Sequence, residues 1–156
     1  MKKIIYFLPA LLFFFSCSSD SSDDLPGEEE AKTSKFTVEF LQSGDTDKFE
    51  QEISFAGSPV GWENTETGAE VDPELSNSEG QHFSSSFSYS TEDPTTNIRV
   101  IYQAIPFDLE EELSLDVTFK IYKNGELIDT KEISINNDII KTHYFDWLYF
   151  ADEQYM

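Results

Sequence analysis

The stretch LSLDVTFKIYKNGELID, residues 113–129, decides the fold of this chain. Its first half alternates apolar and polar residues, which is the two-residue period of a half-buried β-strand. The apolar positions are Leu113, Leu115, Val117, Phe119 and Ile121. Asn124-Gly125 then gives the strongest short-range signal for a two-residue hairpin turn. The stretch therefore predicts two antiparallel strands joined by a tight turn.

The turn also predicts how the two strands are aligned. A type I′ turn at Asn124-Gly125 places Ile121 opposite Ile128. If this register continued along the second strand, Ile133 would point away from the core. We therefore predict a β-bulge near Thr130-Lys131, which returns Ile133 to the core face.

Similar alternation predicts further strands on both sides of this hairpin. Residues 36–40 and 49–55 are two such runs across a short turn, and we predict that they pair as a hairpin. Residues 83–89 alternate in the same way, and residues 139–150 form a last strand rich in aromatic side chains. Residues 97–105 carry apolar side chains at both odd and even positions, and thus on both faces of a strand. This pattern predicts a central strand covered on both faces.

About seven such runs, with turn signals between them and no convincing helical period, predict an all-β chain. We expect a single immunoglobulin-like antiparallel β-sandwich of about seven strands over residues 35–151, followed by a frayed tail at 152–156. The segment from Ile105-Pro106-Phe107 to Lys123-Asn124-Gly125-Glu126 is similar to small immunoglobulin-like sandwiches of bacterial envelope proteins. That resemblance implies a fold and no activity.

The first residues carry a different signal. Lys2 and Lys3 precede an apolar run at residues 4–15, which is about 18 Å long as a helix. Such a helix is too short for a hydrocarbon core of about 30 Å but has the size of a signal-peptide core. Cys17 is the only cysteine in the chain, and no A-x-A-like cleavage site competes with it. We predict that residues 1–16 form a signal peptide.

Ser16-Cys17 resembles the lipobox of bacterial lipoproteins, in which a small residue precedes a cysteine that is acylated and becomes the first residue. Phe14 and Phe15 depart from the usual pattern of Leu followed by a smaller residue. The Ser/Asp-rich stretch that follows resembles the acidic export tag of surface lipoproteins, and its composition equally fits a disordered linker. The resemblance implies lipidation at Cys17, a tether at residues 17–34, and a location at the outer membrane or cell surface with the domain outside the lipid bilayer.

Charge restricts the partners of the domain. Residues 36–156 contain 25 acidic and 6 basic residues, a net charge of −19. Such a surface repels phosphates, so we predict no nucleic-acid partner, whereas cations and basic partners are compatible with it. Since Cys17 is the only cysteine, the domain has neither a disulfide nor a thiolate metal site.

Residues 57–80 are rich in Gly, Pro and acidic residues and predict a long, mostly irregular loop with one short strand near Val60-Gly61-Trp62. Clustered oxygen ligands suit Ca²⁺, and the candidate ligands are Asp72, Glu74, Asn77 and Glu79. The loop lacks the EF-hand motif, and carboxylates cluster by chance in so acidic a chain, so a solvated loop is the competing interpretation.

Aromatic side chains are the second kind of candidate site. Trp62 lies in the predicted loop and is the candidate to bind a sugar or a partner, because loops often carry function. Trp147, Tyr144 and Tyr149 belong to the last strand, where packing is the more common role. Core packing also competes as the interpretation of Trp62.

Catalysis has little support. The chain has two histidines, His82 and His143, and no G-x-S-x-G, H-E-x-x-H or Gly-rich phosphate loop. We therefore predict a non-enzymatic cell-envelope lipoprotein whose sandwich binds or scaffolds an unidentified partner outside the membrane, with an envelope protein or a glycan as the candidates. The alternative is a Ca²⁺- or glycan-binding accessory module, and no other cofactor is expected.

Overall fold

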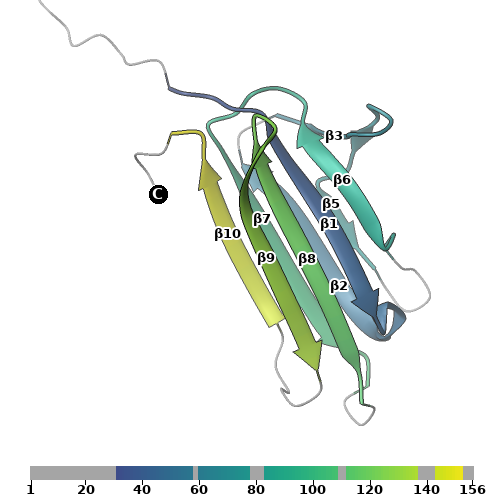
Figure 1. The fold of residues 1–156 in the computed structure, drawn as a ribbon. Coiled ribbons are helices and arrows are strands. Elements are labelled where there is room, and N and C mark those ends of the chain that lie inside the picture. The colour runs from purple at the N-terminus through teal and green to yellow at the C-terminus, as the bar shows by residue number, and fades with distance from the viewer. Residues whose placement is uncertain (1–30, 58–59, 78–82, 109–111, 137–142, 153–156) are drawn as a thin grey trace, which may run out of the picture. The chain divides into compact units, whose positions relative to one another are not determined.

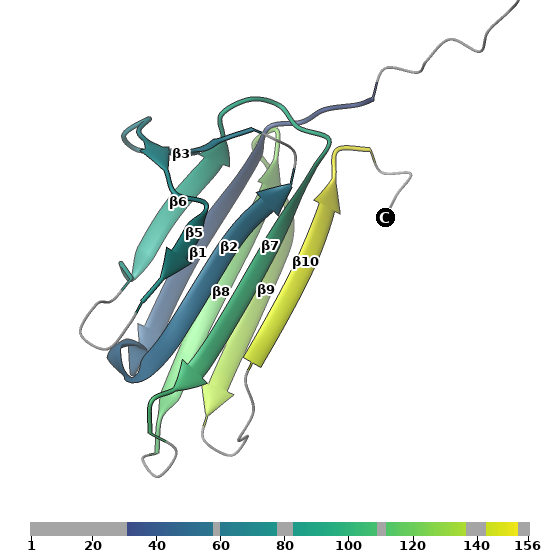
Figure 2. The same ribbon diagram turned by 180° about the vertical axis from the view of Figure 1, so that it is seen from behind.

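The computed structural model describes residues 31–57, 60–77, 83–108, 112–136 and 143–152, and the predicted signal peptide and Cys17 lie outside these ranges. The described residues form a sandwich of two antiparallel sheets, seen from opposite sides in Figures 1 and 2. Seven of the strands are six residues or longer. The prediction of a single all-β sandwich of about seven strands is therefore confirmed.

The six-stranded sheet has the order β4 (Glu70–Val71), β3 (Trp62–Asn64), β6 (Ser86–Thr91), β1 (Phe36–Gly44), β8 (Ser114–Lys123) and β9 (Glu126–Asn136). The four-stranded sheet has the order β10 (His143–Phe150), β7 (Asn97–Pro106), β2 (Phe49–Gly57) and β5 (Glu74–Ser76). A short 3₁₀ helix, η1 (Thr46–Lys48), lies between β1 and β2. In the described part of the chain, no helix is long and apolar enough to cross a membrane.

The core is formed by alternate residues of both sheets, as the two-residue period predicts. Phe40 lies at the centre of an aromatic cluster and is fully buried. Its ring stacks on Phe87 with 4.7 Å between centroids and meets the edge of Phe119 at 5.2 Å. Tyr102, from the other sheet, lies 6.5 Å away. This cluster joins the two sheets at the middle of the sandwich.

The hairpin predicted at Asn124-Gly125 is present. Both residues have positive φ angles, +52° and +83°, as a type I′ turn requires. Beyond the first two cross-strand pairs the register shifts by one residue, so Ile121 pairs with Asp129. The prediction that Ile121 faces Ile128 is therefore wrong, because Ile128 is the extra residue of a bulge.

The bulge itself is confirmed, but it lies closer to the turn than Thr130-Lys131. With Ile128 outside the regular pairing, Val117 pairs with Ile133, which is 8% exposed and belongs to the core. Ile128 is 38% exposed. A bulge next to the turn corrects the whole second strand, whereas a later one would leave more of it in the wrong register.

Strands β1 and β2 do not pair with each other, so the predicted hairpin of residues 36–40 and 49–55 is wrong. β1 pairs with β6 and β8, whereas β2 pairs with β5 and β7. The chain passes from one sheet to the other through η1. Gly44 ends β1 with φ +94°, and a Cβ there would lie 2.4 Å from the carbonyl oxygen of Ser114. This crossing needs a residue without a side chain.

Two further expectations are corrected. Residues 60–77 contain three short strands (β3, β4 and β5), not one. β7 is an inner strand of its sheet, as predicted, but among the described residues only its inner face is covered. On its outer face Arg99 is exposed, and Ile101 and Gln103 are half-buried. Apolar residues at both odd and even positions of this strand therefore do not mean that a second layer covers its outer face.

Candidate functional site

The predicted calcium ligands lie around β5. The Oδ1 atom of Asp72 accepts a hydrogen bond of 2.9 Å from the backbone N–H of Glu74, which shapes the turn into this strand. Both side chains are exposed. Glu79 lies outside the described residues. Across the described ranges, no three Asp, Glu, His or Cys side chains gather closely enough to hold a metal ion.

Asn77 is placed in the interior, with 4% of its surface exposed. Its Oδ1 accepts a hydrogen bond from the backbone N–H of Gln51, and its Nδ2 donates one of 3.0 Å to the carbonyl of Phe49. The side chain thus extends the pairing of β5 with β2 beyond the last residue of β5. Because its carbonyl oxygen serves β2, only Asp72 and Glu74 of the predicted ligand set remain on the described surface.

A buried polar network continues from this point. Gln51 is fully buried; its Oε1 accepts a hydrogen bond of 3.0 Å from the Tyr102 hydroxyl, and its Nε2 donates one of 2.9 Å to Gln42. Burial raises the pKa of Tyr102, so its hydroxyl stays protonated and can donate. The signal for this network was a polar residue, Gln51, at a core-facing position of an alternating strand. Its role is structural, because its described polar atoms satisfy one another.

Trp62 occupies a packing position, which was the interpretation that competed with a binding role. Trp62 is 4% exposed and packs on Phe55, with 5.0 Å between ring centroids. Tyr149 is also buried and donates a hydrogen bond of 2.9 Å to Asp129. Trp147 is half-buried against Phe119. Of the four aromatic candidates, Tyr144 is the most exposed to solvent, with 55% of its surface accessible.

Tyr144 belongs to the uncovered side of the four-stranded sheet, here called the outer face. This face is formed by Tyr144, Asp146 and Leu148 of β10, Arg99, Ile101 and Gln103 of β7, Glu52 and Ser54 of β2, and Glu74 and Ser76 of β5. The register sets Tyr144 beside Gln103, Gln103 beside Glu52, and Glu52 beside Ser76. One row across the sheet therefore combines an aromatic ring, an amide, a carboxylate and a hydroxyl.

A hollow of about 430 Å³ lies on the outer face, between Tyr144 and β5. Three carboxylates line it, those of Glu52, Asp72 and Glu74. The described part of the chain provides none of these three carboxylates with a cation. The hollow is thus negatively charged, and the polar side chains of Ser54, Ser76 and Gln103 and the ring of Tyr144 also line it.

Arg99 and Asp146 form the ion pair of this face. The guanidinium donates to both carboxylate oxygens, with 2.7 Å between Nε and Oδ1. The pair lowers the pKa of Asp146 and raises that of Arg99, mainly through these hydrogen bonds. Asp146 is therefore neutralised across the β10–β7 pairing.

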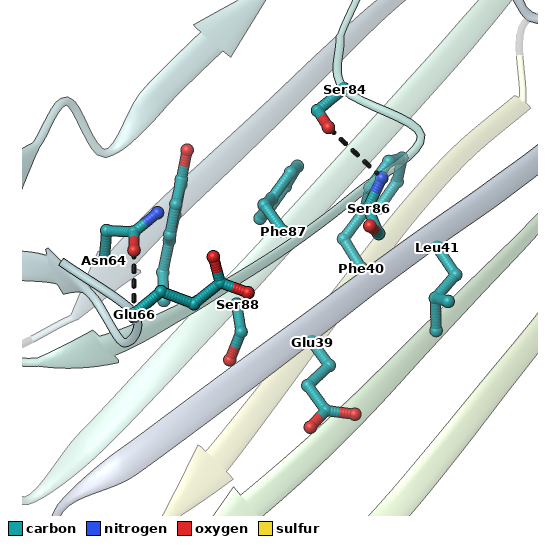
Figure 3. A pocket seen from close by; sticks show the side chains of 10 residues that line it. Glu39, Phe40, Leu41, Asn64, Glu66, Ser84, Ser86, Phe87 and Ser88 are labelled. Atoms are coloured by element: carbon teal, nitrogen blue, oxygen red, sulfur yellow. Dashed lines mark hydrogen bonds between the residues drawn. The ribbon is translucent and has the colours of Figure 1, made fainter.

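A second hollow of about 430 Å³ lies beside β6 (Figure 3). Glu39 and Leu41 come to it from β1, and Glu66 comes from the turn after β3, where its backbone N–H donates a hydrogen bond of 2.9 Å to Asn64. Glu39 already accepts a hydrogen bond of 3.0 Å from the Tyr122 hydroxyl. This hollow therefore offers less unpartnered charge than the one on the outer face.

His143 begins β10 and stacks parallel to Phe145, with 6.4 Å between ring centroids. Its buried Nε2 atom has no hydrogen-bond partner among the described residues, and burial lowers the pKa of the ring. These features fit a neutral imidazole that packs at the sheet edge. His82, the other histidine, lies outside the described ranges.

Comparison with known proteins identifies the fold. The chain matches no protein-family model and no curated protein sequence. It is similar in structure to a DUF4425 domain of unknown function from Bacteroides vulgatus, with a TM-score of 0.60 and 20% sequence identity over 76% of this chain and 94% of that chain. A DUF4425 family protein from Bacteroides ovatus gives a TM-score of 0.59 and 15% identity over 76% of this chain and 96% of that one.

A third similar structure is the calcium-bound form of a protein from Parabacteroides distasonis. Its TM-score is 0.54 and its identity 23%, over 80% of this chain and 99% of that chain. At these identities the likeness shows a shared sandwich fold.

Proposed function

We propose that this protein is a lipid-anchored lipoprotein of the cell envelope whose β-sandwich is a non-catalytic binding module. The observation that carries the proposal is the position of Cys17, the only cysteine, between a signal-like apolar run and an acidic tether. Several acyl chains on one cysteine hold a protein stably, whereas a single myristoyl chain binds only marginally. The negative domain would be repelled by anionic lipid surfaces, which suits a module held away from the bilayer.

The outer face supports the binding role. It is an open sheet surface with one exposed aromatic ring and a hollow lined by carboxylates, amide and hydroxyl groups. Binding sites commonly combine a concave surface with a few polar groups in this way. The proposed ligands are a protein or a glycan of the envelope, and the charge of the domain excludes strongly anionic ones.

Substitution of Cys17 by serine should release the protein from membranes or block its processing. Without the thiol there is no site for acylation, so the leader should remain uncleaved or the chain should become soluble. Membrane fractionation and intact mass measurement after expression in a bacterial host check this result. The matched control is Ser19→Ala, which should stay in the membrane fraction with normal mass. Normal processing and membrane retention of Cys17→Ser would contradict the anchor.

Calcium binding is the second candidate function, and the calcium-bound form of the Parabacteroides distasonis protein favours it. Asp72 and Glu74 supply two exposed carboxylates of the kind that Ca²⁺ prefers. The described residues do not by themselves assemble three such ligands. The proposal is therefore limited to binding near β5, with Asp72 as the residue to test.

Calcium should raise the thermal stability of the domain if this site exists. A ligand at about 100 times its Kd adds roughly 2.7 kcal/mol to the free energy of unfolding, which corresponds to a rise in Tm of about ten degrees for a domain of this size. Asp72→Asn keeps the Oδ1 acceptor for the turn but loses the charge, so it should abolish the rise. Asp93→Asn and a Mg²⁺ titration are the controls. An unchanged Tm with Ca²⁺ would refute this second function, and a rise that survives Asp72→Asn would exclude Asp72.

A further inference from the structure

The described sheets have four edge strands, and three of them carry features that discourage pairing with another chain. β4 and β5 are only two and three residues long. β9 is long, but it contains the bulge at Ile128 and the charged residues Glu126, Asp129, Lys131 and Glu132. Short length, bulges and charges are the usual ways in which proteins protect sheet edges.

β10 has none of these features. Its eight residues, HYFDWLYF, pair with β7 in one unbroken register, without a bulge, proline or lysine. Its single carboxylate, Asp146, is neutralised by Arg99. Figures 1 and 2 both show β10 at the margin of the four-stranded sheet. An extended, regular and apolar edge of this kind is suited to receive another strand.

The pairing pattern shows which backbone groups are available. Ala151 donates a hydrogen bond of 2.7 Å to the carbonyl of Thr96, in the same register as the β10–β7 ladder. Because bonded positions alternate in an antiparallel pair, the odd-numbered residues of β10 bond to β7. The N–H and C=O groups of Tyr144, Asp146 and Leu148 therefore point away from β7, to an edge where no described strand pairs with them. Tyr144 and Leu148 also carry exposed side chains, with 55% and 51% of their surfaces accessible.

Apolar side chains on the inner side of β10 remain partly exposed along the same edge. Phe145 and Trp147 face the core but are only half-buried, unlike the fully buried Phe40 at the centre of the sandwich. A strand added beside β10 would cover part of both rings and pair with the free backbone groups. Only an extended polypeptide offers alternating donors and acceptors at the spacing that such an edge requires.

We propose that β10 is a docking edge for an extended segment of a partner protein, which joins the four-stranded sheet as an added strand. The segment carries basic residues and alternating apolar side chains, because it meets a domain with a net charge of −19 and lies beside Tyr144 and Leu148. This inference rests on the proposed binding function and names its partner class.

A second copy of the chain fits this edge less well. Pairing of two β10 strands would bring together two domains that each carry a net charge of −19 over residues 36–156. Electrostatic repulsion between two such domains disfavours this pairing.

The test uses the full chain in detergent and a fluorescent peptide, Lys-Val-Thr-Val-Arg-Val-Thr-Val-Lys, at physiological ionic strength. Anisotropy should show saturable binding, and hydrogen exchange should slow at the amides of Tyr144 and Leu148. A peptide of the same sequence with N-methyl groups on alternate residues keeps the charge but loses donors on one edge. Its binding should be weaker by about tenfold or more.

Two variants locate the site. Leu148→Lys adds a positive charge to β10 and should weaken binding of the peptide by about tenfold or more. Leu127→Lys on β9 is the matched control, since Leu127 is 50% exposed and Leu148 51%. It should change binding by less than about twofold, as expected for a surface charge that is not on the docking edge. Leu148→Pro removes the outward N–H without breaking a bond to β7 and should weaken binding as much as Leu148→Lys.

Three outcomes would overturn the proposal. Equal binding of the N-methylated peptide would show that charge alone attracts it. Protection elsewhere than β10, or equal losses in Leu127→Lys and Leu148→Lys, would place the site elsewhere. Sedimentation that shows a dimer disrupted by Leu148→Lys would assign the edge to a second copy. The peptide assay does not require acylation of Cys17, so failure of membrane anchoring leaves the peptide result unaffected.

Discussion

Replacement of Phe40 by alanine is expected to destabilise the domain by about 3–5 kcal/mol, the range for loss of a buried phenylalanine. Phe40 is fully buried, and its ring contacts Phe87, Phe119 and Tyr102. Alanine at this position removes apolar surface from the core and leaves a cavity between the two sheets, which close packing cannot easily fill. Since small domains are stable by about 5–15 kcal/mol, the variant should unfold at a much lower urea concentration.

Phe107→Ala is the matched control for Phe40→Ala. Phe107 follows β7 and is 43% exposed, and its backbone N–H bond to the carbonyl of Lys48 does not depend on the side chain. Its replacement should change the free energy of unfolding by about 0.5 kcal/mol or less. A loss below about 1 kcal/mol in Phe40→Ala would show that the aromatic cluster does not join the sheets in solution.

Replacement of Asn77 by alanine should cost about 2–5 kcal/mol. The change leaves the backbone N–H of Gln51 and the carbonyl of Phe49 without the partners that Asn77 gives them. Each buried polar group that loses its partner costs roughly 1–3 kcal/mol. Amide exchange at Gln51 should also become faster than in the parent protein, which separates loss of this bond from a general loss of stability.

Asn136→Ala provides the comparison for Asn77→Ala. Asn136 ends β9 and is exposed, so its side chain can be replaced by water contacts. We expect its loss to lie within about 0.5 kcal/mol. If the two substitutions cost the same, water must reach Gln51 and Phe49, and the buried network would not hold β5 against β2.

The strands and their inward faces could be predicted from the sequence, because the alternation of apolar and polar residues shows which side chains face the core. The way in which the strands divide between the two sheets could not be predicted in this way. β1 and β2 show the same period whether they pair with each other or face each other across the core. The clue was Gly44, whose close approach to Ser114 marks the crossing, but a glycine in a turn is also what a hairpin would contain.

The candidate site was predictable only in part. Trp62 and Asn77 lie in a segment rich in turn residues, which predicts surface positions, yet both are buried beside short strands of that segment. Tyr144 was visible as an aromatic residue of the last strand, but its exposure depends on which face of the four-stranded sheet stays open. Composition does not contain that information, because it arises from the register of β10 on β7.

The position of β1 also determines how the domain would carry a mechanical load. β1 pairs with β8 at nine positions and with β6 at five, so it is held on both sides. A pull applied through residues before Phe36, directed along the strand, would shear both ladders at once instead of opening them one bond at a time. A domain pulled from this end while a partner grips another strand would therefore resist extension through its central strand, and its rupture force would report directly on these two ladders.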